Sequence, residues 1–147
     1  MRRRKSIEKR AKLHDKIVEK IFETPKTLPI EINGEVIKKL KFPKSVIDKK
    51  EFADIIFVTL KEKTLNIYFI ELKTGLFWGG KAKQQIKTAT NLFIKEFKQF
   101  KQFWEKKLGI EKLDFEKITV HSMLVWFDKT EVFPKLKIES SKKIIIN

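Results

Sequence analysis

The sequence predicts one α/β domain, and three features of its apolar pattern lead to that prediction. Apolar residues recur at three- and four-residue steps between positions 81 and 107, which is typical of a long amphipathic helix. Two apolar runs joined by a short charged turn occupy positions 54–73, and a further apolar run follows at 118–127. Helical and strand-like segments that alternate along one chain are typical of an α/β fold.

The first forty residues predict a helix followed by a hairpin. Residues 6–22 carry an apolar stripe at helical spacing, and Pro25 and Pro29 end it. Residues 27–42 then contain two short apolar runs around Asn33-Gly34, a pair that strongly favours a two-residue hairpin turn.

We expect the chain to form a single domain over residues 1–147, with short connections between its helices and strands. A basic connection at 43–50 leads to a strand that we expect to begin near Glu51, and a glycine-punctuated loop at 74–80 precedes the long helix. Residues 1–5 are expected to be a flexible basic arm. Residues 128–147 are expected to be a C-terminal extension that ends in a short strand or a tail.

Composition points to a folded protein with a polyanionic partner. Of the 147 residues, 41% are apolar, including 13 Phe and 3 Trp, which is enough for a proper core. The net charge is +15, from 34 Lys and Arg against 19 acidic residues, and the pI is near 9.9. A Lys/Glu-rich thermophilic surface would explain many charges but not this imbalance, so we favour nucleic acid as the partner.

Composition also excludes some classes of chemistry. The absence of Cys rules out disulfides, thiolate zinc sites and thiol nucleophiles. No apolar run approaches the roughly 18 residues of a membrane span, and the basic start lacks the apolar region of a secretory signal. We therefore expect no membrane partner and a cytoplasmic location, or the host cytoplasm if the protein is viral.

The chemistry-bearing residues of the 54–73 hairpin are expected to meet at one rim of the sheet. If Lys61–Thr64 form a four-residue loop, Leu60 faces Leu65 and Asp54 lies opposite Glu71 on the same face as Lys73. Two carboxylates with a cation beside them indicate a divalent-metal site, to which the backbone carbonyl of Leu72 can add an oxygen. The alternative is a cross-strand ion pair on a solvated face. We favour the metal site because the acid directly precedes one apolar strand and Glu71-Leu72-Lys73 ends the other.

Ala53-Asp54, followed by Glu71-Leu72-Lys73 after a strand, resembles the motif of the PD-(D/E)XK nuclease superfamily, with Ala53 where the name has proline. The predicted order of elements between residues 6 and 127 is similar to that superfamily's restriction-endonuclease-like αβββαβ core, a mixed central sheet flanked by helices. The resemblance implies Mg²⁺ or Mn²⁺ as cofactor, Asp54 and Glu71 as its ligands, and Lys73 as the catalytic lysine.

The resemblance also draws attention to positions on the two helices. Many such nucleases carry a Gln near the start of the second helix, where this chain has Gln84 and Gln85. We favour Gln85, which borders the apolar stripe, over Gln84; a solvent-facing Gln is the alternative. Some members place a Glu on the first helix, and the nearest register here falls on His14-Asp15. His14 is a candidate metal ligand, but we favour a solvated histidine.

Three groups of residues are candidates for contact with nucleic acid. Arg2, Arg3 and Arg4 have the character of a phosphate-seeking arm, and Lys81, Lys83 and Lys87 lie near the start of the long helix, close to the expected metal site. Trp78, with Phe77, can stack on a base or wedge into a junction. The two residues can equally pack beneath the helix or in a dimer interface, and the sequence does not decide between these alternatives.

Taken together, the sequence predicts a Mg²⁺-dependent endonuclease that hydrolyses phosphodiester bonds of branched or duplex DNA. In size, charge and motif order the chain is similar to the archaeal-type Holliday-junction resolvases. This resemblance implies a homodimer and recognition of DNA structure. Exposed aromatic residues on the long helix (Phe100, Phe103, Trp104) are compatible with a dimer. A non-catalytic nucleic-acid-binding protein on a degenerate nuclease fold and a structural or interaction protein are the alternatives.

Overall fold

A computed structural model describes residues 2–74, 79–127 and 135–146, and the side chains of residues 12–73, 80–127 and 135–146. Its helices are α1 (Arg2–Glu23), the 3₁₀ turn η1 (Pro25–Thr27), α2 (Gly79–Gln99) and α3 (Lys101–Lys107). Its strands are β1 (Glu35–Lys41), β2 (Ile55–Lys61), β3 (Thr64–Thr74), β4 (Lys117–Phe127) and β5 (Leu136–Ile146).

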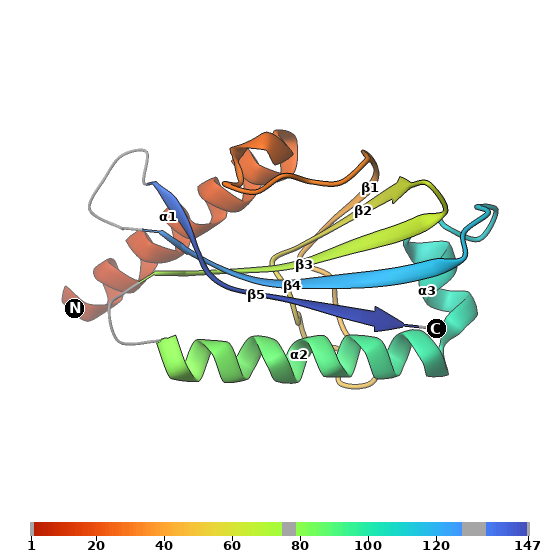
Figure 1. Cartoon of the computed structure of the whole chain (residues 1–147). Coiled ribbons are helices and arrows are strands. Elements are labelled where there is room, and N and C mark those ends of the chain that lie inside the picture. The colour runs from red at the N-terminus through yellow and green to blue at the C-terminus, as the bar shows by residue number, and fades with distance from the viewer. Residues whose placement is uncertain (1, 75–78, 128–134, 147) are drawn as a thin grey trace.

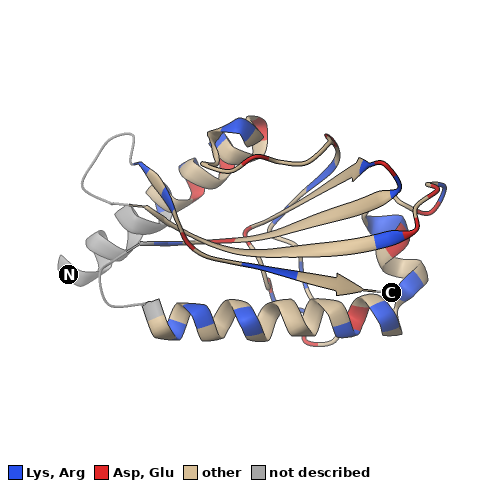
Figure 2. Ribbon diagram, in the orientation of Figure 1, with Lys and Arg blue, Asp and Glu red and all other residues tan. Residues whose placement is uncertain are grey.

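The strands form one mixed sheet in the order β1-β2-β3-β4-β5, in which β3 and β4 are parallel and the other neighbours are antiparallel. Helix α1 lies on one face of the sheet, and α2 with α3 lies on the other (Figure 1). Basic residues recur along α2, whereas β2 and the central part of β3 carry almost no charge (Figure 2). The prediction of an α/β protein with a mixed sheet between helices is therefore confirmed.

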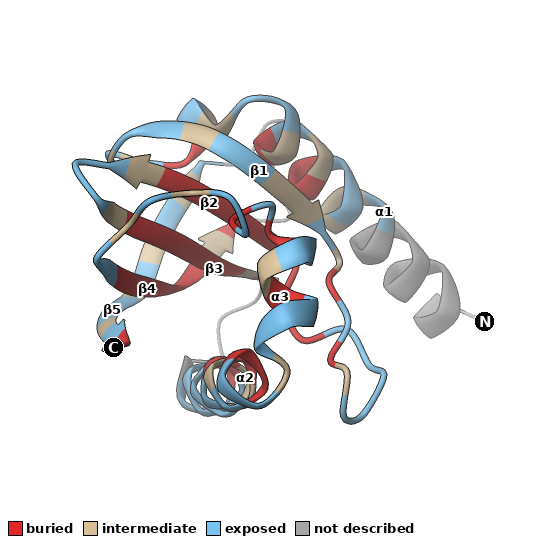
Figure 3. Cartoon of the chain, turned by 90° about the vertical axis from the view of Figure 1, so that its right-hand side faces the viewer, coloured by how far each residue is buried: buried red, intermediate tan, exposed pale blue. Residues whose placement is uncertain are grey.

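Each face of the sheet has its own apolar core, because the central strands are buried on both sides (Figure 3). On the α1 side, Val18 and Ile21 are fully buried and pack in one cluster with Phe57 and Tyr68. On the α2 side, the cluster is aromatic: the ring of Phe93 lies 5.6 Å from that of Phe69 and 5.2 Å from that of Trp104. Among the described residues, no helix combines the length and apolar character that a membrane crossing requires.

The β2–β3 hairpin has the predicted register but a tighter turn. Leu60 pairs with Leu65, as expected, and Lys61 also pairs with Thr64, so only Glu62 and Lys63 form the turn. Both have positive φ, 48° and 65°, which is the backbone of a type I′ turn. The right-handed twist of antiparallel strands favours this turn even without glycine, and the pairing of strand residues is unchanged.

The expected hairpin at 27–42 is wrong in its first half, and only β1 is a strand. Leu28 is buried in the α1-side core, and Ile30 and Ile32 pack against the same core instead of pairing with β1. Asn33 joins this segment to the sheet, because its N–H donates to the Tyr68 hydroxyl at 2.8 Å and its carbonyl accepts from Thr59. Burial of the apolar side chains beneath α1 thus outweighs the turn preference of Asn33-Gly34.

The single long helix predicted for 81–107 is instead two helices. The chain breaks at Phe100, whose φ and ψ of −114° and 51° are not helical. The break turns Trp104 into the core beside Phe93, leaving it 1% exposed, whereas Phe103 stays half exposed. The prediction that Trp104 is an exposed aromatic of a dimer surface is therefore wrong, because core packing takes it.

Three smaller expectations also change. Helix α1 begins at Arg2, so residues 2–5 continue a helix rather than a flexible arm, as their helix-favouring side chains allow. Strand β2 begins at Ile55 rather than near Glu51, which makes only an isolated bridge to Lys44. Strand β5 spans 11 residues and pairs along β4, so the C-terminal extension completes the sheet instead of forming a short strand or tail.

A buried carboxylate fastens α2 to the segment that precedes β2. Glu96 is fully buried and accepts hydrogen bonds from the Ser45 hydroxyl at 2.6 Å, from the Ile47 N–H at 3.3 Å and from the Val46 N–H. The buried oxygens of Glu96 thus have the hydrogen-bond partners that buried polar atoms require. Glu96 thereby fixes the start of the loop that leads to Asp54.

Replacing Glu96 with Ala is expected to lower the free energy of unfolding by about 3 kcal/mol, because it leaves buried donors without an acceptor. Urea denaturation followed by circular dichroism measures this change. Lys98→Ala on an exposed face of the same helix is the control and should change stability by less than about 0.5 kcal/mol. Equal effects of the two substitutions would contradict the role assigned to Glu96.

Candidate functional site

The backbone of Asp54 is held where β1, β2 and β3 come together. Its N–H donates to the Ile70 carbonyl at 3.0 Å, and its own carbonyl accepts from the Phe42 N–H at 2.9 Å. Phe42 has a φ of 52°, a left-handed conformation that residues other than glycine rarely adopt. This turn after β1 allows the chain to loop away and return so that Asp54 directly precedes β2.

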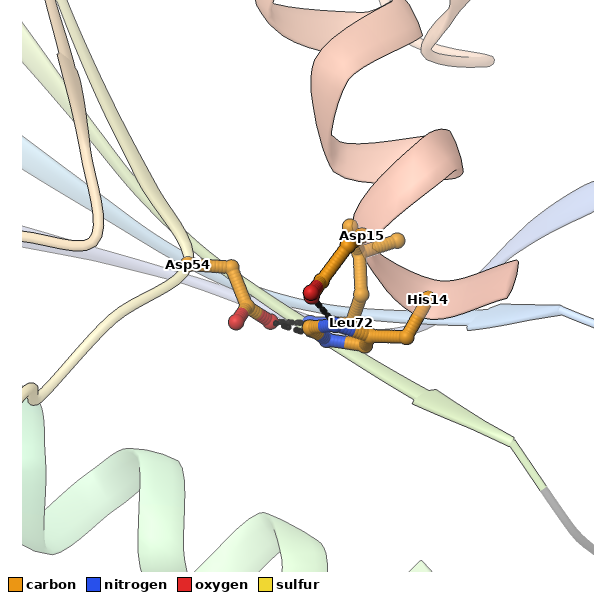
Figure 4. Close-up of polar contacts among 4 residues, drawn as sticks. All are labelled: His14, Asp15, Asp54 and Leu72. Atoms are coloured by element: carbon orange, nitrogen blue, oxygen red, sulfur yellow. Dashed lines mark hydrogen bonds and ion pairs between the residues drawn. The ribbon is translucent and has the colours of Figure 1, made fainter. Parts of the chain in front are cut away.

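The carboxylate of Asp54 contacts both its strand neighbour and α1 (Figure 4). Its Oδ2 accepts from the Leu72 N–H at 2.6 Å and lies 3.1 Å from Nε2 of His14. The other ring nitrogen of His14, Nδ1, lies 3.1 Å from Oδ1 of Asp15. Because β2 has not yet begun at Asp54, the side chain of a residue on α1 can reach this edge of β3.

Glu71 joins this group to make a three-residue cluster. His14, Asp54 and Glu71 each offer one potential ligand atom, and these atoms all lie within 4.8 Å of one another. The prediction that Asp54 and Glu71 converge is confirmed, and its reason is the β2–β3 register, which pairs Ile55 with Ile70. The prediction that His14 is a solvated histidine is wrong. Helix α1 packs this residue against the sheet edge, where its Nε2 interacts with the Asp54 carboxyl group.

Burial and charge shift the pKa values of two members of the cluster. Burial raises the pKa of Glu71 and the negative charge of Asp54 raises it further, to about 9, while the nearby Lys73 opposes the shift. Burial alone would lower the pKa of His14, but its hydrogen bonds and charge interactions with Asp54 and Asp15 outweigh that effect and raise it to about 9. Both shifts favour the protonated forms of Glu71 and His14.

Glu71 and Lys73 open onto a pocket of about 530 Å³ between the sheet edge and α2. Lys81, Gln84 and Gln85 line it from α2. The segment before β2 contributes a further set of lining residues, namely Asp48, Lys50, Glu51 and Phe52. The pocket therefore combines carboxyl groups, ammonium groups and amides beside the three-residue cluster.

The structure brings some of the predicted α2 residues to this pocket and separates others. Gln84 and Gln85 are both exposed and both line it, so the pocket does not distinguish between the two candidates. Lys81 lines the same pocket, but Lys83 and Lys87 line a different one, between α2 and β5. The three lysines thus divide between two pockets, because successive residues of a helix point about 100° apart.

The other predicted residues are placed as follows. The N–H of Leu72 faces Asp54, and the carbonyl of a strand residue points to the same side as its N–H. His121 is a structural strand residue: its ring stacks on Tyr68 with centroids 4.4 Å apart and its Nε2 lies 2.9 Å from Oδ1 of Asn66. The side chains of Arg2, Arg3 and Arg4 and the residues Phe77 and Trp78 lie outside the part of the chain that the structure describes.

Two residues near the cluster have roles that the sequence analysis did not predict. Asp15 orients the His14 ring through Nδ1, and the negative charge of Glu51 contributes to the raised pKa of Glu71. Only the adjacency of Asp15 to His14 in the sequence could have indicated that Asp15 orients the His14 ring. Nothing in the sequence pattern marks Glu51, since it lies before β2 and reaches the pocket through the fold of the 43–53 loop.

The stability that His14 contributes is expected to depend on pH. A group whose folded-state pKa is raised from 6.5 to about 9 stabilises the fold fully below pH 6.5 and loses that contribution as pH rises through 9. We therefore expect His14→Asn to lower the free energy of unfolding by about 2 kcal/mol at pH 6 and by much less at pH 9.5.

Chemical denaturation in metal-free buffer over this pH range measures the difference. Both proteins are compared in a Glu71→Gln background, so that the carboxyl group of Glu71 does not titrate in the same range. A difference that stays constant between pH 6 and 9.5 would exclude the His14–Asp54 ion pair as its source.

Comparisons of the chain with protein-family models, with curated proteins and with solved structures found no match. The residues, distances and charges given above are therefore the basis for assigning a function.

Proposed function

We propose that the protein is a metal-dependent nuclease that hydrolyses phosphodiester bonds of DNA in the pocket beside Glu71 and Lys73. One observation carries the proposal: carboxyl oxygens of Asp54 and Glu71 and a ring nitrogen of His14 lie within 4.8 Å of one another at the edge of a sheet. Two carboxyl groups this close together at a partly buried sheet edge mark a candidate functional site.

The donor set is compatible with a hard divalent cation. Ligand atoms that share one Mg²⁺ at about 2.1 Å cannot lie more than about 4.2 Å apart, so the cluster needs to contract by less than about 1 Å. Asp54 and Glu71 would hold the metal, and the Leu72 carbonyl could add an oxygen. Mg²⁺ and Mn²⁺ both prefer such oxygen ligands, and His14 would stay hydrogen-bonded to Asp54 or serve as a further ligand.

The residues around the pocket suit the hydrolysis of a phosphodiester. The bound metal would supply Lewis-acid polarisation of the phosphate and acidify the attacking water. Lys73 would orient that water or stabilise the negative charge that grows on the phosphate oxygens. Gln84 or Gln85 would donate a hydrogen bond to the phosphate, and Lys81 would attract the backbone.

The fold and the composition support the same proposal. The order α1, β1, β2, β3, α2, β4 is the αβββαβ order of the PD-(D/E)XK nucleases that the motif resembles. The net charge of +15 suits a polyanionic substrate, and recognition of DNA structure, such as a branch point, is part of the proposal. A homodimer, as in Holliday-junction resolvases, is part of the proposal, and the half-exposed Phe103 is a candidate contact for it.

One observation favours the alternative of a nucleic-acid-binding protein without catalysis. The Asp54 Oδ2 already interacts with the Leu72 N–H and with His14, so the cluster is satisfied internally. In that case Asp54 is a structural residue that ties α1 to β3. Cleavage assays separate the two functions, because only the nuclease needs the three side chains for turnover.

Conservative substitutions at the cluster test the proposal. Asp54→Asn, Glu71→Gln and Lys73→Met should each lower the rate of DNA cleavage by at least about 100-fold while leaving DNA affinity largely unchanged. Supercoiled, flap and four-way-junction DNA with Mg²⁺ or Mn²⁺ are the substrates, and affinity is measured in EDTA. Asp48→Asn, a carboxylate that lines the pocket outside the cluster, is the control and should remain active. Undiminished cleavage by the three variants would refute the proposal.

Metal binding is expected to release a proton and to strengthen with pH. The Glu71 carboxyl, with a pKa near 9, must lose its proton before it can bind a cation, so affinity for Mn²⁺ should rise between pH 6.5 and 8.5. Isothermal titration calorimetry in buffers with different ionisation enthalpies counts the released protons. The release should be absent in Glu71→Gln, and a pH-independent affinity of the wild type would contradict this assignment.

A further inference from the structure

A second basic site lies across α2 from the candidate metal pocket. It is a groove of about 220 Å³ between α2 and β5. The polar lining that solvent can reach consists of Lys83, Lys87 and Asn91 from α2 and Ser140, Ser141 and Lys142 from β5. Basic residues of β5 lie above basic turns of α2 (Figure 2). We propose that this groove binds phosphate groups of a nucleic-acid backbone that extends past the metal pocket, a proposal that rests on the proposed function.

The lining of the groove is selective for an anion. Among the described residues none that lines it is acidic, whereas the metal pocket and the pocket at α3 each contain several acidic residues. No ion pair joins Lys83, Lys87 or Lys142 to an acidic residue in the part of the chain that the structure describes. Glu139, the acidic residue of β5, falls at a register shift in the pairing with β4 and does not line the groove. The groove therefore gathers positive charge that the protein itself does not neutralise.

The positions of the polar groups at the base and at the rim of the groove indicate which of them contact the ligand. At its base Thr90 donates to the Ile86 carbonyl at 2.6 Å, and its oxygen lies 2.8 Å from the Ser122 hydroxyl. These two hydroxyls are thus satisfied by the protein. The rim offers the donors: ammonium groups, the Asn91 amide and the hydroxyls of β5. Lysines and small polar side chains on a shallow rim are the groups that usually contact phosphate oxygens of a nucleic acid.

The position of the groove connects it to the metal pocket. Lys81, Gln84 and Gln85 face the metal pocket, and Lys83 and Lys87 face the groove, although all five lie within two turns of α2. A strand whose scissile phosphate lies at Glu71 and Lys73 could therefore cross the first turns of α2 and place a neighbouring phosphate in the groove. The groove would then hold the substrate beyond the cleaved bond and contribute to affinity without touching the reacting atoms.

The salt dependence of DNA binding tests this inference. Each lysine that contacts a phosphate contributes about 0.9 to the slope of log affinity against log salt for duplex DNA. Lys87→Ala and Lys142→Ala should each reduce the slope by about 1 and weaken binding roughly fivefold at 0.1 M salt, and the double variant should reduce it by about 2. Fluorescence anisotropy with a labelled duplex of about 20 base pairs in EDTA, in the Asp54→Asn background, measures both quantities.

Lys98→Ala is the matched control, because it removes the same charge from the same helix but lines the pocket that contains Glu105, Glu111 and Glu116. Thermal unfolding verifies that each variant is folded. Slopes for Lys87→Ala and Lys142→Ala equal to that of the wild type, or changed only as much as for Lys98→Ala, would overturn the groove as a phosphate site.

The two proposals fail in different ways. If wild-type protein never cleaves DNA with Mg²⁺ or Mn²⁺ but the groove variants lower the salt slope, the nuclease assignment is wrong and the groove stands as a nucleic-acid-binding site. If cleavage depends on Asp54 and the groove variants bind DNA as the wild type does, only the groove is wrong.

Discussion

The approach of two carboxyl groups at the edge of the sheet is the constraint on which the site depends. The register of β2 against β3 brings Asp54 and Glu71 together, and like charges at this distance in a buried place oppose each other. The structure relieves the repulsion with the Leu72 N–H and the His14 ring on Asp54 and with Lys73 near Glu71, and the raised pKa of Glu71 favours a proton on its carboxyl group. A divalent cation could replace that proton, which is why the same geometry supports metal binding.

Three segments that are distant in the sequence must be fixed for this cluster to exist. Helix α1 supplies His14, the β2–β3 hairpin supplies the two acids, and α2 faces them across the pocket. The hydrogen bonds of Glu96 to residues 45–47 tie α2 to the loop that delivers Asp54, so the helix and the acid are positioned by one connection. Damage to this buried connection would disturb the site without touching any of its side chains.

The sequence was most informative where pattern and register coincide. The period of two in the hairpin, together with a short turn, was sufficient to predict that Asp54 and Glu71 share an edge, because strand pairing converts a count of residues into a spatial position. It was insufficient for His14, since the rotation of α1 against the sheet depends on tertiary packing. The same limit explains the break at Phe100, where burying Trp104 outweighs continuous helical periodicity, and the lost strand at 28–32, where Leu28 packs under α1 instead of pairing.

The distribution of charge around α2 gives the positive net charge a structural meaning. An evenly mixed surface would place acidic residues near each lysine. None of the described residues that line the groove at β5 is acidic, whereas acids and lysines both line the pocket that holds Glu71. A polyanion that crosses α2 would therefore meet lysines without acids in the groove and, in the metal pocket, lysines mixed with carboxyl groups whose negative charge repels it. A metal bound by Asp54 and Glu71 would remove that repulsion, so binding of the cation and productive seating of the substrate would be thermodynamically linked. In this arrangement the groove contributes affinity for the nucleic acid, and the cluster makes productive seating of the substrate dependent on a bound cation.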